Sequence, residues 1–406
     1  MGAEERFITL NRRRPALGMR LLERVGRGLQ YGSLEIAWPD RPAMLFAGTR
    51  EGPHARLEIR EPRFLRRLLF RGDLGFAEAW MAGEWDTPDL TALLECLALN
   101  QEAIGGLQHR YSVLRWLQWL NHALGRRNSR RGSRRNIARH YDLGNDFYRL
   151  WLDESLTYSG AHFDRDVTGL TQAQQRKYAN MLDMLGAGEG DHILEIGCGW
   201  GGFAIHAARE RNCRVTGVTV SREQLRLARQ RAEEAGVSDR VHFLFQDYRD
   251  IEGQFDFIAS IEMFEAVGEQ YWNSFFTTLR NRLRPGGRAA LQTITIDDAV
   301  FAEYRRRPDF IQTYIFPGGV LASPAVFREH VRDAGLETRK WQSRGQDYAR
   351  TLACWQDRFS EVEPAVRKQG FDEAFVRMWH YYLAYCRAGF RTGRIDLLNT
   401  LLVRAN

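Results

Sequence analysis

Downstream of residue 190, apolar runs alternate with helical patterns. The first apolar run contains Ile193, Leu194 and Ile196, and a helical pattern begins at Phe203. Further strand-like runs follow at 214–220, 241–245, 255–261 and 288–296. A second helical pattern begins after Ser221, a residue type that caps helices. This alternation predicts βαβ units and a doubly wound, mostly parallel sheet.

The first part of the chain has a different pattern. Residues 32–38 and 55–60 alternate between apolar and polar side chains with a period of two, as half-buried strands do. A turn with two prolines follows at 39–42, and residues 62–70 have helical spacing. We expect a small α+β domain over residues 1–125, without a catalytic constellation of its own.

Length and composition narrow the class of protein. The 406 residues allow two or three domains with a substantial core. Apolar runs stay well short of the roughly 18 residues needed to span a bilayer, and residues 1–6 lack the pattern of a secretory signal. The five cysteines are scattered, without metal-ligand or disulfide spacing. We therefore expect a reduced, cytoplasmic protein that binds no metal.

Positive charge is concentrated between the two parts of the chain. The net charge is +7, and the cations are arginines except for Lys177, Lys340 and Lys368. An Arg-rich linker, residues 126–135, contains Arg126, Arg127, Arg130, Arg131, Arg134 and Arg135. Such a block is equally typical of a solvated linker, a nucleic-acid tail and a surface for anionic lipid.

The segment before this linker is rich in Trp and Leu. Residues 114–124 predict a helix that lies either on a membrane surface or in a packed core. The linker divides the chain, so the second domain is expected over residues 136–406.

The glycine-rich turn after the first strand is the most informative local pattern. Residues 195–202 read Glu-Ile-Gly-Cys-Gly-Trp-Gly-Gly. In α/β folds, a turn of this kind between a strand and a helix brings the backbone against a ligand. Glycine tolerates positive φ angles and lets a ligand approach the main chain.

Three cofactor classes compete for this turn. A dinucleotide site needs an acid at the end of the next strand, but that strand ends in Thr219-Val220-Ser221. A phosphate-binding loop needs Gly-Lys-Ser/Thr, which the turn lacks. The Glu-x-Gly-x-Gly pattern is typical of class I methyltransferases that bind S-adenosylmethionine. Asp247 after the third strand and the turn at 284–287 favour this third class.

Several segments around the fold resemble one family in particular. Residues 136–148, 156–160 and 260–268 are similar to those of the cyclopropane-fatty-acid synthase family, which methylates cis double bonds in lipid acyl chains. Residues 314–319, 347–352 and 382–390 match as well. The similarity covers about two thirds of the chain, from residue 136 onward. The N-terminal domain more loosely resembles that of longer bacterial members that act on phospholipids.

The resemblance implies a set of residues that bind S-adenosylmethionine. Tyr158 and Ser159 would hold its methionine end from above, as part of a lid. Contacts to the methionine, ribose and adenine are implied for Gly197, Cys198, Gly199, Thr219, Gln224, Asp247, Tyr248 and Ile261. Thr219 and Gln224 would bind the ribose hydroxyls in place of the missing acid.

The resemblance also implies a bicarbonate ion that acts as the base. Glu265, the backbone of Ile294 and Tyr348 match three of the residues that hold it in the family. Two other positions depart from the family pattern: Gly160 replaces a Cys, and Gln292 replaces a His. Glutamine can still donate a hydrogen bond but cannot titrate, so the binding of bicarbonate is left open.

These departures affect the expected product. An alkene attacks the sulfonium methyl group without an activating side chain, so catalysis rests on positioning and electrostatics. The resulting carbocation could be stabilised by aromatic faces. Loss of a proton from the new methyl group closes a cyclopropane, whereas a hydride shift leads to a methyl-branched or methylene chain. The sequence leaves both products open.

Plainer roles are open for several of these residues. Glu265 could cap the helix after the fourth strand, and Tyr348 could be a core residue. Glu262 could be a solvated turn acid or a second carboxylate that crowds the site. Cys198 is expected to be a small spacer. The aromatic side chains between Phe371 and Phe390 are expected to form a helix core, with lining of an acyl tunnel as the alternative.

The sequence therefore predicts a class I methyltransferase with added helices that form a lid and an acyl pocket. The expected reaction is methylation of an unsaturated phospholipid acyl chain at the inner membrane face. The Arg-rich linker is expected to contact anionic lipid rather than nucleic acid, and the N-terminal domain to contact a membrane or a second copy. A small soluble substrate, or lipid binding without catalysis, are the alternatives.

Overall fold

The computed structural model describes residues 17–101 and 143–405. The Arg-rich linker and the helix predicted at 114–124 lie outside the described residues. Within the described ranges, no helix combines the length and the apolar character that crossing a membrane requires.

The N-terminal unit contains a four-stranded sheet with the order β2-β1-β3-β4. Its elements are α1 (Leu17–Arg27), β1 (Tyr31–Trp38), β2 (Arg41–Ala47), β3 (Arg50–Ile59), α2 (Arg63–Met81), β4 (Trp85–Asp86) and α3 (Leu90–Leu99). The predicted strands at 32–38 and 55–60 lie in β1 and β3, and their alternation is confirmed. One face of the sheet is buried beneath the helices. Its core contains Leu34 and Ile36 of β1, Leu57 of β3, Phe64 of α2 and Leu93 of α3.

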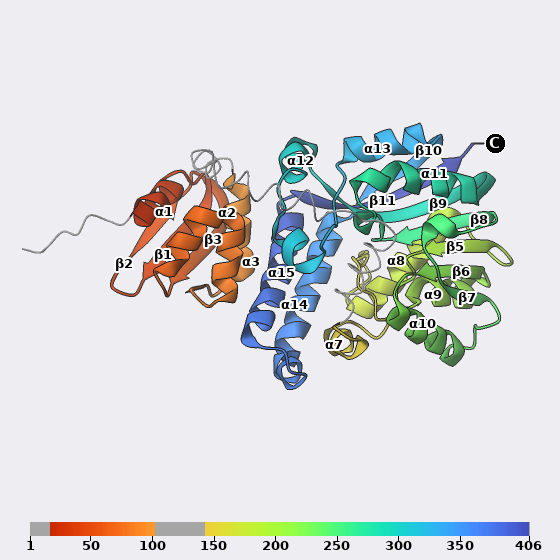
Figure 1. Ribbon diagram of the computed structural model, residues 1–406, viewed down its shortest axis with the longest axis horizontal. Coiled ribbons are helices and arrows are strands. Elements are labelled where there is room, and N and C mark those ends of the chain that lie inside the picture. Colours follow the sequence, from red (N-terminus) through yellow and green to blue (C-terminus); the bar gives the residue numbers. More distant parts are fainter. Residues whose placement is uncertain (1–16, 102–142, 406) are drawn as a thin grey trace, which may run out of the picture.

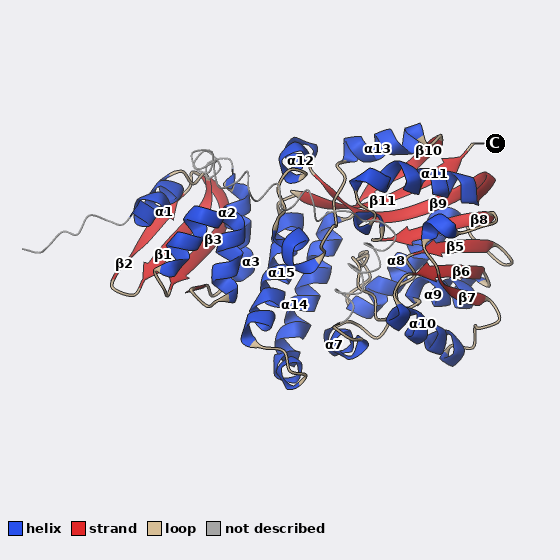
Figure 2. Ribbon diagram, viewed as in Figure 1, coloured by secondary structure: helices blue, strands red, loops and turns tan. Residues whose placement is uncertain are grey.

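The C-terminal unit is built around a seven-stranded sheet with the order β10-β11-β9-β8-β5-β6-β7 (Figures 1 and 2). Its first half comprises α7 (Asn145–Trp151), α8 (Leu170–Leu185), β5 (His192–Ile196), α9 (Gly202–Arg211), β6 (Arg214–Thr219), α10 (Arg222–Glu234), β7 (Val241–Phe245) and β8 (Phe255–Ile261). Its second half comprises α11 (Trp272–Arg282), β9 (Leu283–Ile296), α12 (Asp298–Tyr304), α13 (Pro324–Asp333), β10 (Leu336–Ser343), α14 (Gly345–Lys368), α15 (Glu373–Arg391) and β11 (Ile395–Arg404). Short helical turns lie at Tyr248–Asp250, Phe264–Ala266, Glu269–Tyr271 and Ile311–Ile315.

Successive residues of the central strands point to opposite faces of this sheet. Ile193 belongs to the core that α8, α9 and α10 cover, and its neighbour Leu194 belongs to the core under α11 and α13. Strands β5 to β9 run parallel to one another, and β11 and β10 add an antiparallel edge beside β9. The predicted class I fold is confirmed. Ser221 caps α10 as predicted, because its hydroxyl accepts a hydrogen bond from the Gln224 amide at 3.3 Å.

One predicted boundary is wrong. Residues 284–287 were expected to be a turn before the fifth strand, but β9 already begins at Leu283. Leu283 pairs with Phe255, and the register then shifts so that Arg288 pairs with Phe257. The Pro-Gly-Gly sequence is therefore an irregularity within the strand, at which β9 accommodates residues that have no partner in β8.

Helices α14 and α15 pack against each other and lie between the N-terminal unit and the seven-stranded sheet (Figure 1). The N-terminal unit packs against α15 through α2 and α3, and Arg377 of α15 makes several of the polar contacts. The Arg377 guanidinium lies 3.8 Å from the centroid of the Trp80 ring and donates to the Trp80 carbonyl at 2.5 Å and the Trp85 carbonyl at 3.0 Å. In return, the Trp80 indole donates to the Arg377 carbonyl at 2.8 Å. Since the Arg377 side chain is only 13% exposed, these contacts are largely shielded from water.

We expect Arg377→Ala to weaken this junction strongly. The change leaves two buried carbonyl groups without their charged donor and removes a cation–π contact, at a cost on the order of 2–4 kcal/mol. Urea unfolding followed by tryptophan fluorescence measures the effect. Arg339→Ala removes an exposed arginine of β10, paired with Glu337, and serves as the matched control. Equal unfolding midpoints for the two variants would contradict a structural role for Arg377.

Candidate active site

The glycine-rich turn after β5 presents an open stretch of backbone. Gly197, Gly199 and Gly201 have φ angles of 83°, 51° and 84°. A Cβ atom at Gly197 would lie 2.6 Å from Met263 Cγ, and one at Gly201 would lie 2.7 Å from the Phe243 ring. At Gly199, by contrast, no atom of the described residues lies within 4 Å of the Cβ position. The turn therefore leaves room for a ligand on the main chain, as S-adenosylmethionine requires.

The sheet order brings the predicted cofactor residues to one edge. Gly197 follows β5, Thr219 ends β6, Asp247 follows β7 and Ile261 ends β8, and these four strands are neighbours in the sheet. Ligands of open α/β sheets bind at the carboxyl ends of the strands. The Thr219 hydroxyl donates to Gln224 Oε1 at 3.0 Å, so the two predicted ribose ligands lie together. Their contacts with the cofactor stay predictions.

The two residues predicted to flank the adenine have defined partners. The Asp247 carboxylate accepts two hydrogen bonds from the Arg249 guanidinium, at 2.8 and 2.7 Å. The Tyr248 ring packs edge-on against Phe275 of α11, at 5.5 Å between centroids. The Tyr248 hydroxyl is buried without a hydrogen-bond partner among the described residues, and burial raises its pKa. Tyr248 thus contributes to packing against α11, and its contact with adenine stays a prediction.

Glu195 and Cys198 support the turn from within. Glu195 is buried and accepts a hydrogen bond from the backbone of Ala204, near the start of α9. The Cys198 side chain is also buried, and burial raises the pKa of its thiol well above the usual value. A thiol held in the neutral form is a poor nucleophile, which agrees with the predicted role of a small spacer.

The segment Tyr158-Ser159-Gly160 is anchored by three different helices and by the end of β8. The Tyr158 hydroxyl donates to the Tyr382 hydroxyl of α15 at 2.7 Å. The Ser159 hydroxyl accepts from Lys177 Nζ of α8 at 2.6 Å. The Gly160 amide donates to a carboxylate oxygen of Glu262 at 2.7 Å, next to the ring of Tyr348 from α14. This segment therefore lies where β8, α8, α14 and α15 meet.

Lys177 was not predicted as a site residue. It is fully buried, and burial lowers its pKa to about 7, against the opposing effect of Glu262, Asp153 and Glu195. The sequence held one signal: the chain uses arginine almost everywhere else. A buried lysine can be neutral or charged at physiological pH, whereas arginine stays charged.

Glu262 is a second carboxylate within the site, one of the two roles that the sequence left open. Its Oε1 atom accepts from the Gly160 amide at 2.7 Å and from Gln292 Nε2 at 2.9 Å. Its Oε2 atom accepts from the Tyr348 hydroxyl at 2.6 Å. The φ angle of Glu262 is +49°, an uncommon value for a residue with a side chain. The interpretation as a solvated turn acid is therefore wrong.

The Gln292 amide is oriented by a buried histidine. Gln292 Oε1 lies 3.1 Å from His162 Nε2, while Gln292 Nε2 donates to Glu262. The other His162 nitrogen lies 3.1 Å from the Asn180 side-chain amide, and Asn399 is a further neighbour of the ring. Burial and the charges of nearby cations lower the His162 pKa to about 3, so the ring is neutral. His162, Asn180 and Asn399 come from distant segments. The sequence therefore carried no local signal for this group of hydrogen-bonded side chains.

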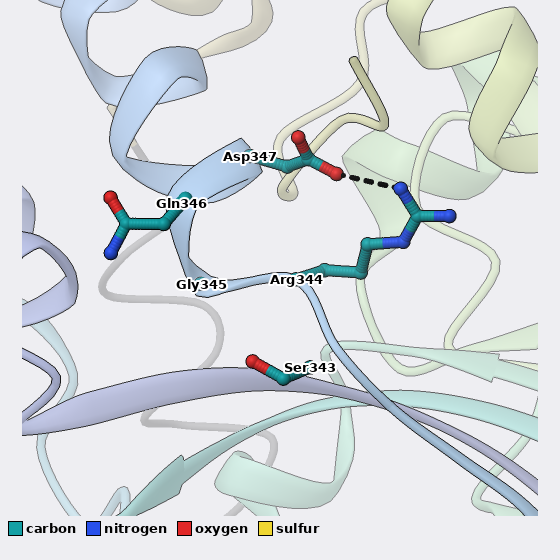
Figure 3. A pocket seen from close by; sticks show the side chains of 5 residues that line it. All are labelled: Ser343, Arg344, Gly345, Gln346 and Asp347. Carbon is teal, nitrogen blue, oxygen red and sulfur yellow. Dashed lines mark hydrogen bonds and ion pairs between the residues drawn. The ribbon is translucent and has the colours of Figure 1, made fainter. Parts of the chain in front are cut away.

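Tyr348 is fixed by the start of α14. Its amide donates to the Arg344 carbonyl, and Arg344 pairs with Asp347 at 3.0 Å and Asp164 at 3.2 Å. A shallow hollow of about 270 Å³ lies at this turn, lined by Ser343, Arg344, Gly345, Gln346 and Asp347. Figure 3 shows these five residues and the ion pair between Arg344 and Asp347. The Tyr348 ring stacks on Phe390 of α15 at 4.4 Å. Tyr348 is buried, but its bond to Glu262 makes it more than a plain core residue.

Glu265 points toward β9 rather than toward a helix end. Its Oε1 atom accepts from the Thr293 hydroxyl at 2.9 Å and from the Ile294 amide at 2.5 Å. Its Oε2 atom is buried without a hydrogen-bond partner among the described residues. Burial, then the charge of Glu262, raises the pKa of Glu265 to about 8. No side chain caps the helical turns and α11 that follow β8, so the interpretation of Glu265 as a helix cap is wrong.

The geometry does not fit the bicarbonate site that the resemblance implies. Tyr348, Gln292 and the Gly160 amide already donate to Glu262, and the Ile294 amide donates to Glu265. A second anion would have to displace these carboxylates or lie beside them at a cost in electrostatic repulsion.

The aromatic side chains of α15 serve two purposes. Phe371, Phe375 and Trp379 stack in sequence and surround Phe147, which confirms the predicted helix core. On the same helix, aromatic rings reach the candidate site through Tyr382 at Tyr158 and Phe390 at Tyr348.

Comparison with known proteins agrees with this geometry. The family model described as mycolic acid cyclopropane synthetase matches residues 128–400. A tuberculostearic acid methyltransferase of Mycobacterium tuberculosis is 40% identical, over 96% of this chain and 91% of its own length. A cyclopropane-fatty-acyl-phospholipid synthase of Escherichia coli is 33% identical, over 86% of this chain and 88% of its own.

A solved structure supports the fold and the cofactor. A mycolic acid cyclopropane synthase complexed with SAH and CTAB superposes with a TM-score of 0.63 at 30% identity, covering 67% of this chain and 98% of its own. The residues that the family model matches, 128–400, include the sheet edge at which the predicted cofactor residues lie. This chain therefore belongs to the mycolic acid cyclopropane synthetase family and is an S-adenosylmethionine-dependent C-methyltransferase with a class I fold.

Proposed function

We propose that the protein transfers the methyl group of S-adenosylmethionine to the cis double bond of an unsaturated phospholipid acyl chain. The product is a cyclopropane or a methyl-branched or methylene acyl chain. The observation that carries the proposal is the carboxylate of Glu262, held by Tyr348, Gln292 and the Gly160 amide beside the glycine-rich turn. A site for alkene methylation needs such a fixed charge more than it needs an activated nucleophile.

The aromatic side chains around Tyr158 support a reaction of an apolar substrate that forms a carbocation. Tyr158 contacts the rings of Trp355 at 5.4 Å and Phe316 at 6.5 Å, and Tyr382 packs against Phe316 at 6.3 Å. These rings keep water away from the site and present π faces that stabilise positive charge. When it is bound at the turn, S-adenosylmethionine supplies an electrophilic methyl group.

The extent of the similarity favours a phospholipid as the substrate. The Escherichia coli relative, whose name specifies acyl phospholipid, matches 86% of this chain. The mycolic acid synthase matches only 67%. The additional match extends into the N-terminal part of the chain. We infer that the N-terminal unit helps the enzyme to reach a substrate embedded in the membrane, from the cytoplasmic side.

The direct test uses methyl-labelled S-adenosylmethionine and phospholipid vesicles. We expect the purified protein to transfer label into vesicles of cis-unsaturated phospholipid, because only these offer a π bond to the methyl group. Vesicles of the saturated phospholipid with the same headgroup are the control and should stay unlabelled. Label in a soluble compound without vesicles, or bound cofactor with no transfer at all, would contradict the proposal.

We further propose that the Arg-rich linker binds anionic lipid. Each arginine near an anionic surface contributes about 1 kcal/mol, and salt screens this attraction. The pair Arg130→Glu and Arg131→Glu should therefore lower binding to anionic vesicles at least about tenfold, most clearly at low salt, in a flotation assay. Arg339→Glu with Lys340→Glu changes the net charge equally on exposed positions of β10 and is the control. Equal binding by both double variants would rule out a specific role for the linker.

A further inference from the structure

We propose that the carboxylate of Glu262 is itself the base of the reaction and takes the place of a bound bicarbonate ion. The inference rests on the proposed function and specifies how that reaction ends. It concerns a residue to which the resemblance assigns no role.

The carboxylate of Glu262 is surrounded by hydrogen-bond donors. A base anion in this position needs donors that hold it in one orientation. Tyr348, Gln292 and the Gly160 amide supply three hydrogen bonds of 2.6 to 2.9 Å, and all three end on Glu262. Both positions that depart from the family pattern thus donate to this carboxylate, Gly160 through its backbone and Gln292 through its side-chain amide.

The space around Gly160 agrees with this assignment. A Cβ atom there would lie 2.8 Å from Leu397 Cδ2 and 2.9 Å from the Tyr348 ring, closer than side-chain atoms approach each other. The absence of a side chain at this position lets Tyr348 reach Glu262. The glycine and the glutamate are therefore two parts of one arrangement.

The carboxyl groups of Glu262 and Glu265 have different electrostatic surroundings. Burial raises the pKa of Glu262, but its three hydrogen bonds and the charge of Lys177 oppose that rise. Glu265 receives two hydrogen bonds on one oxygen, its other oxygen has no partner among the described residues, and the charge of Glu262 raises its pKa further. Of two neighbouring carboxyl groups, the one with more hydrogen-bond donors and a nearby cation has the better stabilised charged form. Glu262 is then the group that can accept a proton.

The backbone of Glu262 has a strained φ angle, a feature that is common among functional residues. A φ angle of +49° disfavours any side chain with a Cβ atom. Glycine adopts this conformation without strain. A glutamate in this position implies that its carboxylate offsets the strain, and strained residues cluster at active sites.

The step balances without a further reactant. After methyl transfer, the acyl chain carries a carbocation. One C–H bond of the transferred methyl group breaks, and its electron pair forms the third bond of the ring or, after a hydride shift, a carbon–carbon double bond. The proton passes to the Glu262 carboxylate, which becomes a neutral carboxyl group and later releases the proton to water.

The experiment compares wild type, Glu262→Gln and Glu262→Gly in buffers depleted of or supplied with bicarbonate. Wild-type turnover should change less than about twofold on depletion. Glu262→Gln keeps the shape but cannot accept a proton, so its kcat should fall about 10²- to 10⁴-fold. Its affinity for S-adenosylmethionine, measured by calorimetry, should stay within about threefold. Glu189→Gln, at an exposed position before β5, is the control for loss of one carboxylate.

Glu262→Gly separates a base from a structural group. Glycine relieves the backbone strain and leaves Tyr348, Gln292 and Gly160 facing a vacated space, so the variant should fold with an unchanged circular dichroism spectrum. Added bicarbonate or formate should raise its turnover at least about tenfold and leave wild type unaffected. A purely structural role for Glu262 would give no such rescue.

Direct binding of isotope-labelled bicarbonate, measured by nuclear magnetic resonance, distinguishes this inference from the proposed function. Saturable binding by wild type, or turnover that requires bicarbonate, would overturn the role of Glu262 even if lipid is methylated. Full activity of Glu262→Gln would overturn it as well. If wild type methylates no lipid under any condition, the proposed function fails instead, and the inference fails with it.

Discussion

A single carboxylate connects several segments of the candidate site that are far apart in the sequence. Glu262 follows β8, and its side chain binds the backbone of segment 158–160, a glutamine of β9 and a tyrosine of α14. These elements could not be held in place by apolar packing alone, because packing tolerates small shifts. Three hydrogen bonds to one charged group fix them to within a few tenths of an ångström. The shape of the site therefore depends on this charge.

Burying such a charge is unfavourable, and the surrounding structure compensates for it. Lys177 supplies the opposite charge from α8, while His162 stays neutral and orients Gln292 so that its amide donates. Apart from Lys340 and Lys368, the rest of the chain carries its positive charge on arginine, which stays charged when buried. A lysine can adjust its protonation to its neighbours, and the site uses it where acids are gathered.

The sequence predicted the strands, turn and helix around the site better than the contacts between side chains within it. Strand periodicity, the glycine-rich turn and the Ser221 cap are local patterns, and each was found where expected. The register shift in β9 was missed because it depends on pairing with β8. The sequence left two roles open for Glu262, since the position alone does not reveal which donors reach it. The family resemblance supplied Tyr348 and Glu265 but placed an ion where this chain has its own carboxylate.

The packing at Gly160 has a consequence for how substitutions at this site combine. A Cβ atom at position 160 would lie 2.8 Å from Leu397 and 2.9 Å from the Tyr348 ring, and that ring is also held by its bond to Glu262. The effect of a side chain at 160 therefore depends on whether Glu262 is present to hold the ring, so that the free-energy changes of substitutions at the two positions are not additive.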